Sequence, residues 1–201
     1  MDTLKPLDQV TVPDERWHNF GRLEDAGTFA RHTLAERHAS INEIELSPTA
    51  PDPIREHFET AKNLLLYAWF VYRFIPVAEL HAYSTVEMAL RERAKLVAPK
   101  TRNLARLLKV AIERGWIVDE GFGLVRRGRQ AAEREREMLK QSGISATPEE
   151  RDVQRYCKVL MDALPELRNE LAHGSHMIHP GGFRTLALCA DLINQLFPGK
   201  S

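Results

Sequence analysis

An arginine and a histidine that could act together on a phosphate ester lie near the C-terminal end of the chain. The stretch from Glu166 to Gly174 is Glu-Leu-Arg-Asn-Glu-Leu-Ala-His-Gly, so Arg168 precedes His173 by five positions and Asn169 follows the arginine directly. Histidine exchanges protons near neutral pH, and arginine donates paired hydrogen bonds to phosphoryl oxygens. The two residue types could therefore supply proton transfer and charge stabilisation for phosphodiester cleavage without a metal.

A helix that ends at the histidine is the element predicted to position these side chains. An apolar line at helical spacing runs through Leu160, Leu164, Leu167 and Leu171. Asn169 and His173 are four residues apart and share a polar edge of that helix. Gly174 is the residue type that commonly ends a helix in the left-handed conformation. We expect Pro165 to kink or restart this helix, and residues 173–182 to form a loop.

Two other interpretations of these residues stay open at this stage. Arg168 could pair with a carboxylate while His173 caps a helix, with no catalytic role for either. A looser match of the same pattern runs from Arg31 to His38, but it precedes the proline-rich stretch and no glycine follows it. We therefore favour the match at Arg168 and His173 as the functional one.

A carboxylate on another predicted helix is the expected partner of the arginine. In the helix predicted over residues 77–97, Glu87 lies within an apolar stripe formed by Tyr83, Leu90, Ala94 and Val97. An unpaired buried charge is costly, so Glu87 needs a partner, and Arg168 is the one we predict. The alternative is that Glu87 extends past Leu90 into solvent.

The pattern along the whole chain predicts an all-α fold with four or five core helices and an inserted polar helix. Helices are expected over residues 54–74, 77–97, 129–141 and 183–197, with Pro76 separating the first two and Thr101 capping a further one. The run Thr147-Pro148-Glu149-Glu150 is typical of a helix start. Residues 41–46 alternate and could form a short strand. Three prolines in residues 47–53 suggest a linker between an N-terminal extension, residues 1–50, and a bundle domain, residues 51–201.

The helical bundle with Arg-Asn-x-x-x-His before its last helix resembles the HEPN superfamily. The similarity covers residues 54–197 and is carried by Arg168, Asn169, His173 and Gly174. It implies a HEPN-like bundle whose members with an intact Arg-x(4–6)-His motif are typically metal-independent endoribonucleases. Two copies of the motif meet across a homodimer interface in such members. Many of them are toxins or effectors of prokaryotic defence against phage, and others are inactive binding modules.

For this chain the resemblance implies RNA as the substrate and no cofactor. Arg168 and His173 would be catalytic, and Asn169 would hold the histidine or the phosphate. The apolar stripe around Glu87, independently of the resemblance, suggests that Glu87 orients the arginine. The dimer would form around the helix that carries Arg168 and the apolar residues 64–72, and an antitoxin resembling a nucleotidyltransferase would be a partner. The alternatives are a non-catalytic HEPN-like module that binds a nucleotide or a protein, and a structural helical adaptor.

Composition and charge narrow the classes of function. The formal net charge is zero, but residues 91–140 carry 14 Lys or Arg against 7 Asp or Glu, and residues 1–60 carry 6 against 12. This asymmetry could steer a polyanion to the middle of the chain, although solvated helical faces explain it as well. No secretory signal and no apolar stretch long enough for a membrane are present, so we expect a cytoplasmic protein.

Histidine and cysteine patterns favour neither metal binding nor a cysteine nucleophile. His173, His176 and His179 recur every third residue, whereas helical metal ligands prefer a spacing of four, and no cysteine or carboxylate stands nearby to complete a set. His176 or His179 could still contact a phosphate. Cys157 and Cys189 fall on apolar helical faces, where buried thiols are expected.

Overall fold

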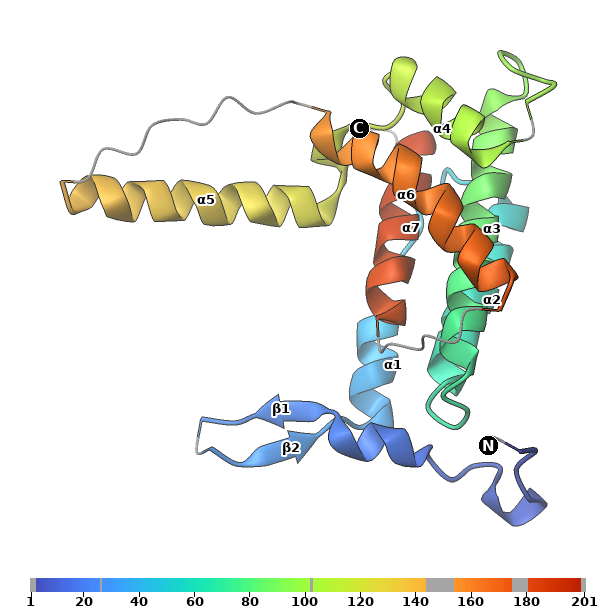
Figure 1. The fold of residues 1–201 in the computed structure, drawn as a ribbon, viewed down its shortest axis with the longest axis vertical. Coiled ribbons are helices and arrows are strands. Elements are labelled where there is room, and N and C mark those ends of the chain that lie inside the picture. The colour runs from blue at the N-terminus through green and yellow to red at the C-terminus, as the bar shows by residue number, and fades with distance from the viewer. Residues whose placement is uncertain (1–2, 26, 102, 144–153, 175–180, 200–201) are drawn as a thin grey trace.

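The computed structural model describes residues 3–25, 27–101, 103–143, 154–174 and 181–199, and this part of the chain is mostly helical (Figure 1). The all-α character predicted from the sequence therefore holds, apart from a two-stranded hairpin near the N-terminus. The helices are α1 (Leu34–Asn42), α2 (Asp52–Tyr67), α3 (Phe74–Ala94), α4 (Leu104–Glu113), α5 (Gly123–Gln141), α6 (Arg155–Ala172) and α7 (Gly182–Leu196). Short 3₁₀ turns occupy Leu7–Gln9, Glu15–Asn19 and Asp119–Gly121.

Helix α3 lies at the centre of the bundle and contacts α2, α4, α6 and α7. Eleven of its 21 residues are buried, because apolar side chains occupy most of its circumference and neighbours cover it on several sides. Each of these five helices contributes buried residues to the core, which also includes residues of the N-terminal segment. Helix α6 runs through Pro165 as one element, and α7 begins and ends within one residue of its predicted limits.

Three predicted boundaries were wrong. Helix α2 ends at Tyr67 rather than at residue 74, and Pro76 lies within the first turn of α3 instead of separating two helices. Proline is tolerated there because the first backbone N–H groups of a helix have no helical acceptor. Helix α4 is capped by Asn103, whose Oδ1 accepts a hydrogen bond from the Arg106 backbone N–H at 3.2 Å, and not by Thr101.

The strand predicted over residues 41–46 was also wrong, since Ile41 belongs to α1. A capping box in which Thr33 and Glu36 bond each other's backbone N–H groups begins that helix. The strands of the described chain are β1 (Gly21–Leu23) and β2 (Phe29–Arg31), paired antiparallel with Gly21 opposite Arg31. Each strand has only three residues, too few to show alternation in the sequence.

The N-terminal segment packs onto the bundle through an aromatic cluster. Trp17 is buried, stacks on Trp69 and donates a hydrogen bond from its indole N–H to the Ala68 carbonyl at 3.0 Å. The Arg37 guanidinium lies over the Trp17 ring and donates to the Leu65 carbonyl. Residues on both sides of the predicted linker therefore contribute to one hydrophobic core.

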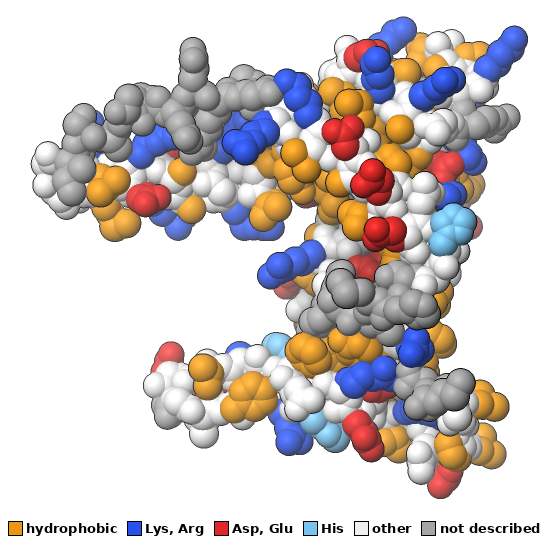
Figure 2. All heavy atoms as spheres, in the orientation of Figure 1, with side chains coloured by type: hydrophobic (Ala, Val, Ile, Leu, Met, Phe, Trp, Pro, Cys, Tyr) orange, Lys and Arg blue, Asp and Glu red, His pale blue; other side chains and the backbone are white. Residues whose placement is uncertain are grey.

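Helix α5 is the inserted polar helix that the sequence predicts, although it begins at Gly123 rather than at residue 129. None of its described residues is buried, and Figure 1 shows it projecting from the bundle on the same side as the hairpin. Lys and Arg side chains stand out along it in Figure 2. The predicted helix start at Thr147 to Glu150 lies outside the described residues. Within the described ranges, no helix is both long and apolar enough to cross a membrane.

Candidate active site

The contact between Glu87 and Arg168 that the sequence predicts is present where α3 packs against α6. Arg168 donates from Nη2 to Oε2 of Glu87 at 3.3 Å, and Glu87 is only 8% exposed. Arg91, one turn further along α3, also pairs with this carboxylate. A buried carboxylate requires such partners because desolvation of an unpaired charge is costly. The two cations together pair with the buried carboxylate of Glu87 where α3 meets α6.

Asn169 fixes the guanidinium of Arg168 from a second direction. Nη1 of Arg168 donates to Oδ1 of Asn169 at 3.2 Å. The Nε atom of Arg168 is buried and has no hydrogen-bond partner among the described residues, whereas about a third of the side chain is exposed. A buried donor without a partner costs free energy. Arg168 is thus bonded to two neighbours through its Nη atoms, while about a third of its side chain remains exposed.

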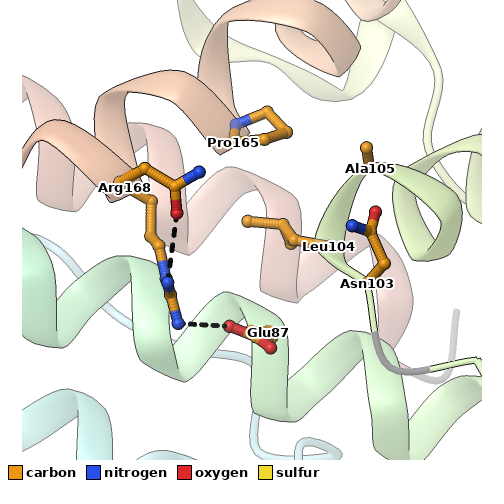
Figure 3. A pocket seen from close by; sticks show the side chains of 7 residues that line it. Glu87, Asn103, Leu104, Ala105, Pro165 and Arg168 are labelled. Carbon is orange, nitrogen blue, oxygen red and sulfur yellow. Dashed lines mark hydrogen bonds and ion pairs between the residues drawn. The ribbon is translucent and has the colours of Figure 1, made fainter. Parts of the chain in front are cut away.

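A shallow pocket of about 180 Å³ opens beside this pair. Three helices contribute to it: α3 through Glu87, α4 through Asn103, Leu104 and Ala105, and α6 through Pro165, Arg168 and Asn169. Figure 3 shows Arg168 and Asn103 on opposite sides of the pocket, with Leu104 between them. The pocket thus combines a charged pair and two carboxamides with a small apolar wall.

His173 lies at the C-terminal cap of α6, outside the set of residues that line this pocket. Its backbone N–H donates to the Asn169 carbonyl at 2.9 Å, and its side chain is exposed. Gly174 has φ +87°, the left-handed conformation predicted for the residue that ends this helix. Five positions separate the histidine from Arg168, which is about 140° around a helix. The structure therefore brings Arg168, Asn169 and Glu87 together around one pocket, and His173 is not among the residues that line it.

Other candidate groups add no chemistry that the described residues support. His176 and His179 lie outside the described residues, and no cluster of three or more His, Cys, Asp or Glu suited to a metal occurs within the described ranges. Cys157 and Cys189 are free and buried, as predicted. Burial raises the pKa of the Cys157 thiol to about 12 and raises that of Cys189 as well, so neither is a ready nucleophile.

Asn103 was not among the site residues predicted from the sequence. Asparagine is a preferred N-cap residue, and Leu104, Leu107, Leu108 and Ala111 follow it at helical spacing. This signal could have identified Asn103 as the start of α4. The position of that helix start opposite Arg168 depends on how α4 packs against α6, and the local sequence carries no such information.

Comparisons of the chain with protein-family models, with curated proteins and with solved structures give no match. The candidate site therefore stands on its own geometry: an ion-paired arginine and its carboxamide neighbour beside a pocket, and an exposed histidine at the end of the same helix.

Proposed function

We propose that the protein is a metal-independent endoribonuclease of the HEPN type. The observation that carries the proposal is the Arg168 guanidinium, which Glu87 and Asn169 hold in place at the rim of a pocket, five residues before an exposed histidine. Arginine fixed in this way can donate two hydrogen bonds to a phosphoryl group at little further cost in conformational entropy. The exposed imidazole is accessible to a substrate.

The chemistry uses the nucleophile that RNA itself carries. A base removes the proton of the 2′-hydroxyl, the resulting oxygen attacks phosphorus, and the bond from phosphorus to the 5′-oxygen breaks. An acid then protonates that 5′-oxygen. His173 serves as the base or the acid, and Arg168 stabilises the negative charge that develops on the phosphoryl oxygens. The products are a 2′,3′-cyclic phosphate and a 5′-hydroxyl.

A homodimer completes this site. One Arg168–His173 pair supplies a single proton carrier, whereas the reaction needs a base and an acid, so a two-fold arrangement that joins two pairs has a chemical purpose. Exposed apolar side chains in segment 64–72 are consistent with a surface on which a second copy of the chain could pack. Tyr67 is 54% exposed and forms an open apolar groove with Leu34, Leu66 and Phe70. Light scattering should show a dimer at micromolar concentration, and a monomer at that concentration would contradict the composite site.

The biological setting follows from the HEPN resemblance alone. We propose a cytoplasmic toxin or an effector of prokaryotic defence, held inactive by an antitoxin that resembles a nucleotidyltransferase. Co-expression with a neighbouring gene product of that kind should remove toxicity to the host cell.

Incubation of the purified full-length protein with mixed cellular RNA in EDTA tests the activity. We expect discrete cleavage products whose yield does not change when Mg²⁺ is added. An RNA population that stays intact with and without metal would overturn the proposal.

A non-catalytic binding module is the second candidate, and one observation favours it. His173 is not among the residues that line the pocket beside Arg168, so this pocket by itself holds no histidine for proton transfer. In this case the protein would bind a nucleotide or another protein and would leave RNA uncut in every condition of the same assay.

A further inference from the structure

The pocket beside Arg168 has the hydrogen-bonding pattern of a site for a planar, polar ring. Glu87 provides a carboxylate at one edge, and Asn103 and Asn169 provide carboxamides. Leu104 and Pro165 add apolar surface of the kind that packs against the face of a ring. The volume of about 180 Å³ falls below the ~300–1,000 Å³ typical of pockets for drug-sized ligands, so it suits a single heterocycle better than a complete dinucleotide.

Existing hydrogen bonds determine which groups remain for a ligand. Oδ1 of Asn103 accepts from the Arg106 backbone N–H, and Oδ1 of Asn169 accepts from Arg168. The amide NH₂ group of each asparagine is thus the part that can donate to a ligand. The Glu87 carboxylate offers about four acceptor positions, of which Arg168 and Arg91 each use one. The pocket therefore presents one acceptor edge and two amide donors, beside the guanidinium of Arg168.

Among the RNA bases, guanine matches this arrangement best. Its Watson–Crick edge carries two adjacent donors, N1–H and N2–H₂, which one carboxylate can accept together. Its O6 and N7 atoms are acceptors, suited to the amide groups of Asn103 and Asn169. Adenine, cytosine and uracil each lack a second adjacent donor for the carboxylate. Proteins commonly recognise unpaired RNA bases through such edges.

We infer that Glu87, Asn103 and Asn169 form a guanine-binding pocket. In the proposed ribonuclease, this pocket would hold the base of the nucleotide next to the cleaved bond, and Arg168 would border both the base and the phosphate. This role of the pocket rests on the proposed function. The same pocket could take the base of a free guanine nucleotide, and the two sources of guanine are separated by experiment.

Binding of mononucleotides to the full-length protein tests the pocket without any need for cleavage. Isothermal titration calorimetry in EDTA should give tighter binding of guanosine 5′-monophosphate than of the adenosine, cytidine or uridine monophosphate, by about tenfold or more, since one bidentate contact typically discriminates by ~1–3 kcal/mol. Equal binding of all four nucleotides, or no binding of any at millimolar concentration, would overturn the inference.

Two substitutions test the residues named. Glu87→Gln keeps the shape of the side chain but replaces one acceptor oxygen by an NH₂ donor, so the preference for guanosine monophosphate should disappear. Asn103→Ser removes the amide donor while serine still caps α4, so binding should weaken about tenfold without loss of the fold. Asn63→Ser is the matched control, because Asn63 is exposed on α2 and bonds its own helix. Unchanged guanine preference in both pocket variants would place the site elsewhere.

Cleavage of RNA oligonucleotides that contain a single guanine identifies the source of the base. Cuts next to that guanine by the parent protein, and cuts without preference by Glu87→Gln, would support the RNA subsite. Selective binding of guanosine monophosphate without any RNA cleavage would support a pocket for a free guanine nucleotide and would contradict the proposed ribonuclease activity. Cleavage without base preference, together with no selective nucleotide binding, would contradict the guanine-binding pocket and leave the proposed ribonuclease activity supported.

Discussion

Two stretches of the chain carry an arginine followed by a histidine at similar spacing, and their surroundings differ. Arg168 and His173 belong to one helix and its cap, and Arg168 is ion-paired with a buried carboxylate from α3. Arg31 is the exposed last residue of β2, and His38 is exposed on α1, a separate element. Spacing in the sequence thus holds two side chains in a fixed relation only where one rigid element carries both.

Arg168 and Arg31 also differ in the neighbours that hold their side chains. A guanidinium that Glu87 and Asn169 already orient loses little freedom when it binds a phosphate. An arginine at the end of a short exposed strand has to be ordered by the substrate itself, which costs side-chain entropy. This contrast is the physical basis for assigning chemistry to Arg168 and not to Arg31.

The largest expected effect is on the rate of RNA cleavage when residues of the two sequence matches are replaced. His173→Ala and Arg168→Ala should each lower the cleavage rate by about 10²–10⁴-fold, because they remove the proton carrier and the stabilisation of the transition state. Arg31→Ala should cleave as the parent does. His38 is unsuitable as a control, because it lines the apolar groove of the proposed dimer. Helical circular dichroism should be preserved in all three variants, since these side chains fill little of the core. Loss of activity in Arg31→Ala alone would show that the chemistry belongs to the N-terminal match.

The next largest effect is on stability, and it tests whether the N-terminal segment that precedes Arg31 and His38 stabilises the fold. Trp17→Ala should lower the free energy of unfolding by about 3–5 kcal/mol, because the indole is buried against Trp69 and Tyr72. Phe29→Ala, at a half-exposed position on the hairpin, is the control and should cost far less. Chemical denaturation measures both. Equal losses in the two variants would show that residues 14–20 are not anchored on the bundle as described.

The smallest effect separates Glu87 from ordinary surface glutamates. Glu87→Ala should lower stability by about 1–2 kcal/mol, less than for a fully buried pair because Arg168 and Arg91 are both partly exposed. It should also lower cleavage, since Arg168 loses its fixed orientation. Glu135→Ala, on the exposed α5, should leave both quantities unchanged. If the two variants melt and cleave alike, Glu87 does not position Arg168.

Periodicity in the sequence predicts the core helices. The position of Glu87 within an apolar stripe favours a cation as its partner, and the structure shows the predicted contact with Arg168. The end of α2 could not be predicted, since residues 64–72 are apolar throughout and hide the turn after Tyr67. The strands of the hairpin are too short to show a pattern. The pocket beside Arg168 was also missed, because it depends on how α6 packs against α3 and α4.

The products of cleavage test the central claim most directly. An RNA oligonucleotide cut by the parent protein in EDTA should yield a 2′,3′-cyclic phosphate and a 5′-hydroxyl, and a single 2′-deoxynucleotide at the cleavage site should abolish that cut. Mass spectrometry of the fragments identifies both ends. Fragments with a 5′-phosphate, or a cut that persists at the deoxynucleotide, would mean that an activated water and not the 2′-hydroxyl attacks phosphorus, which contradicts the roles assigned to Arg168 and His173.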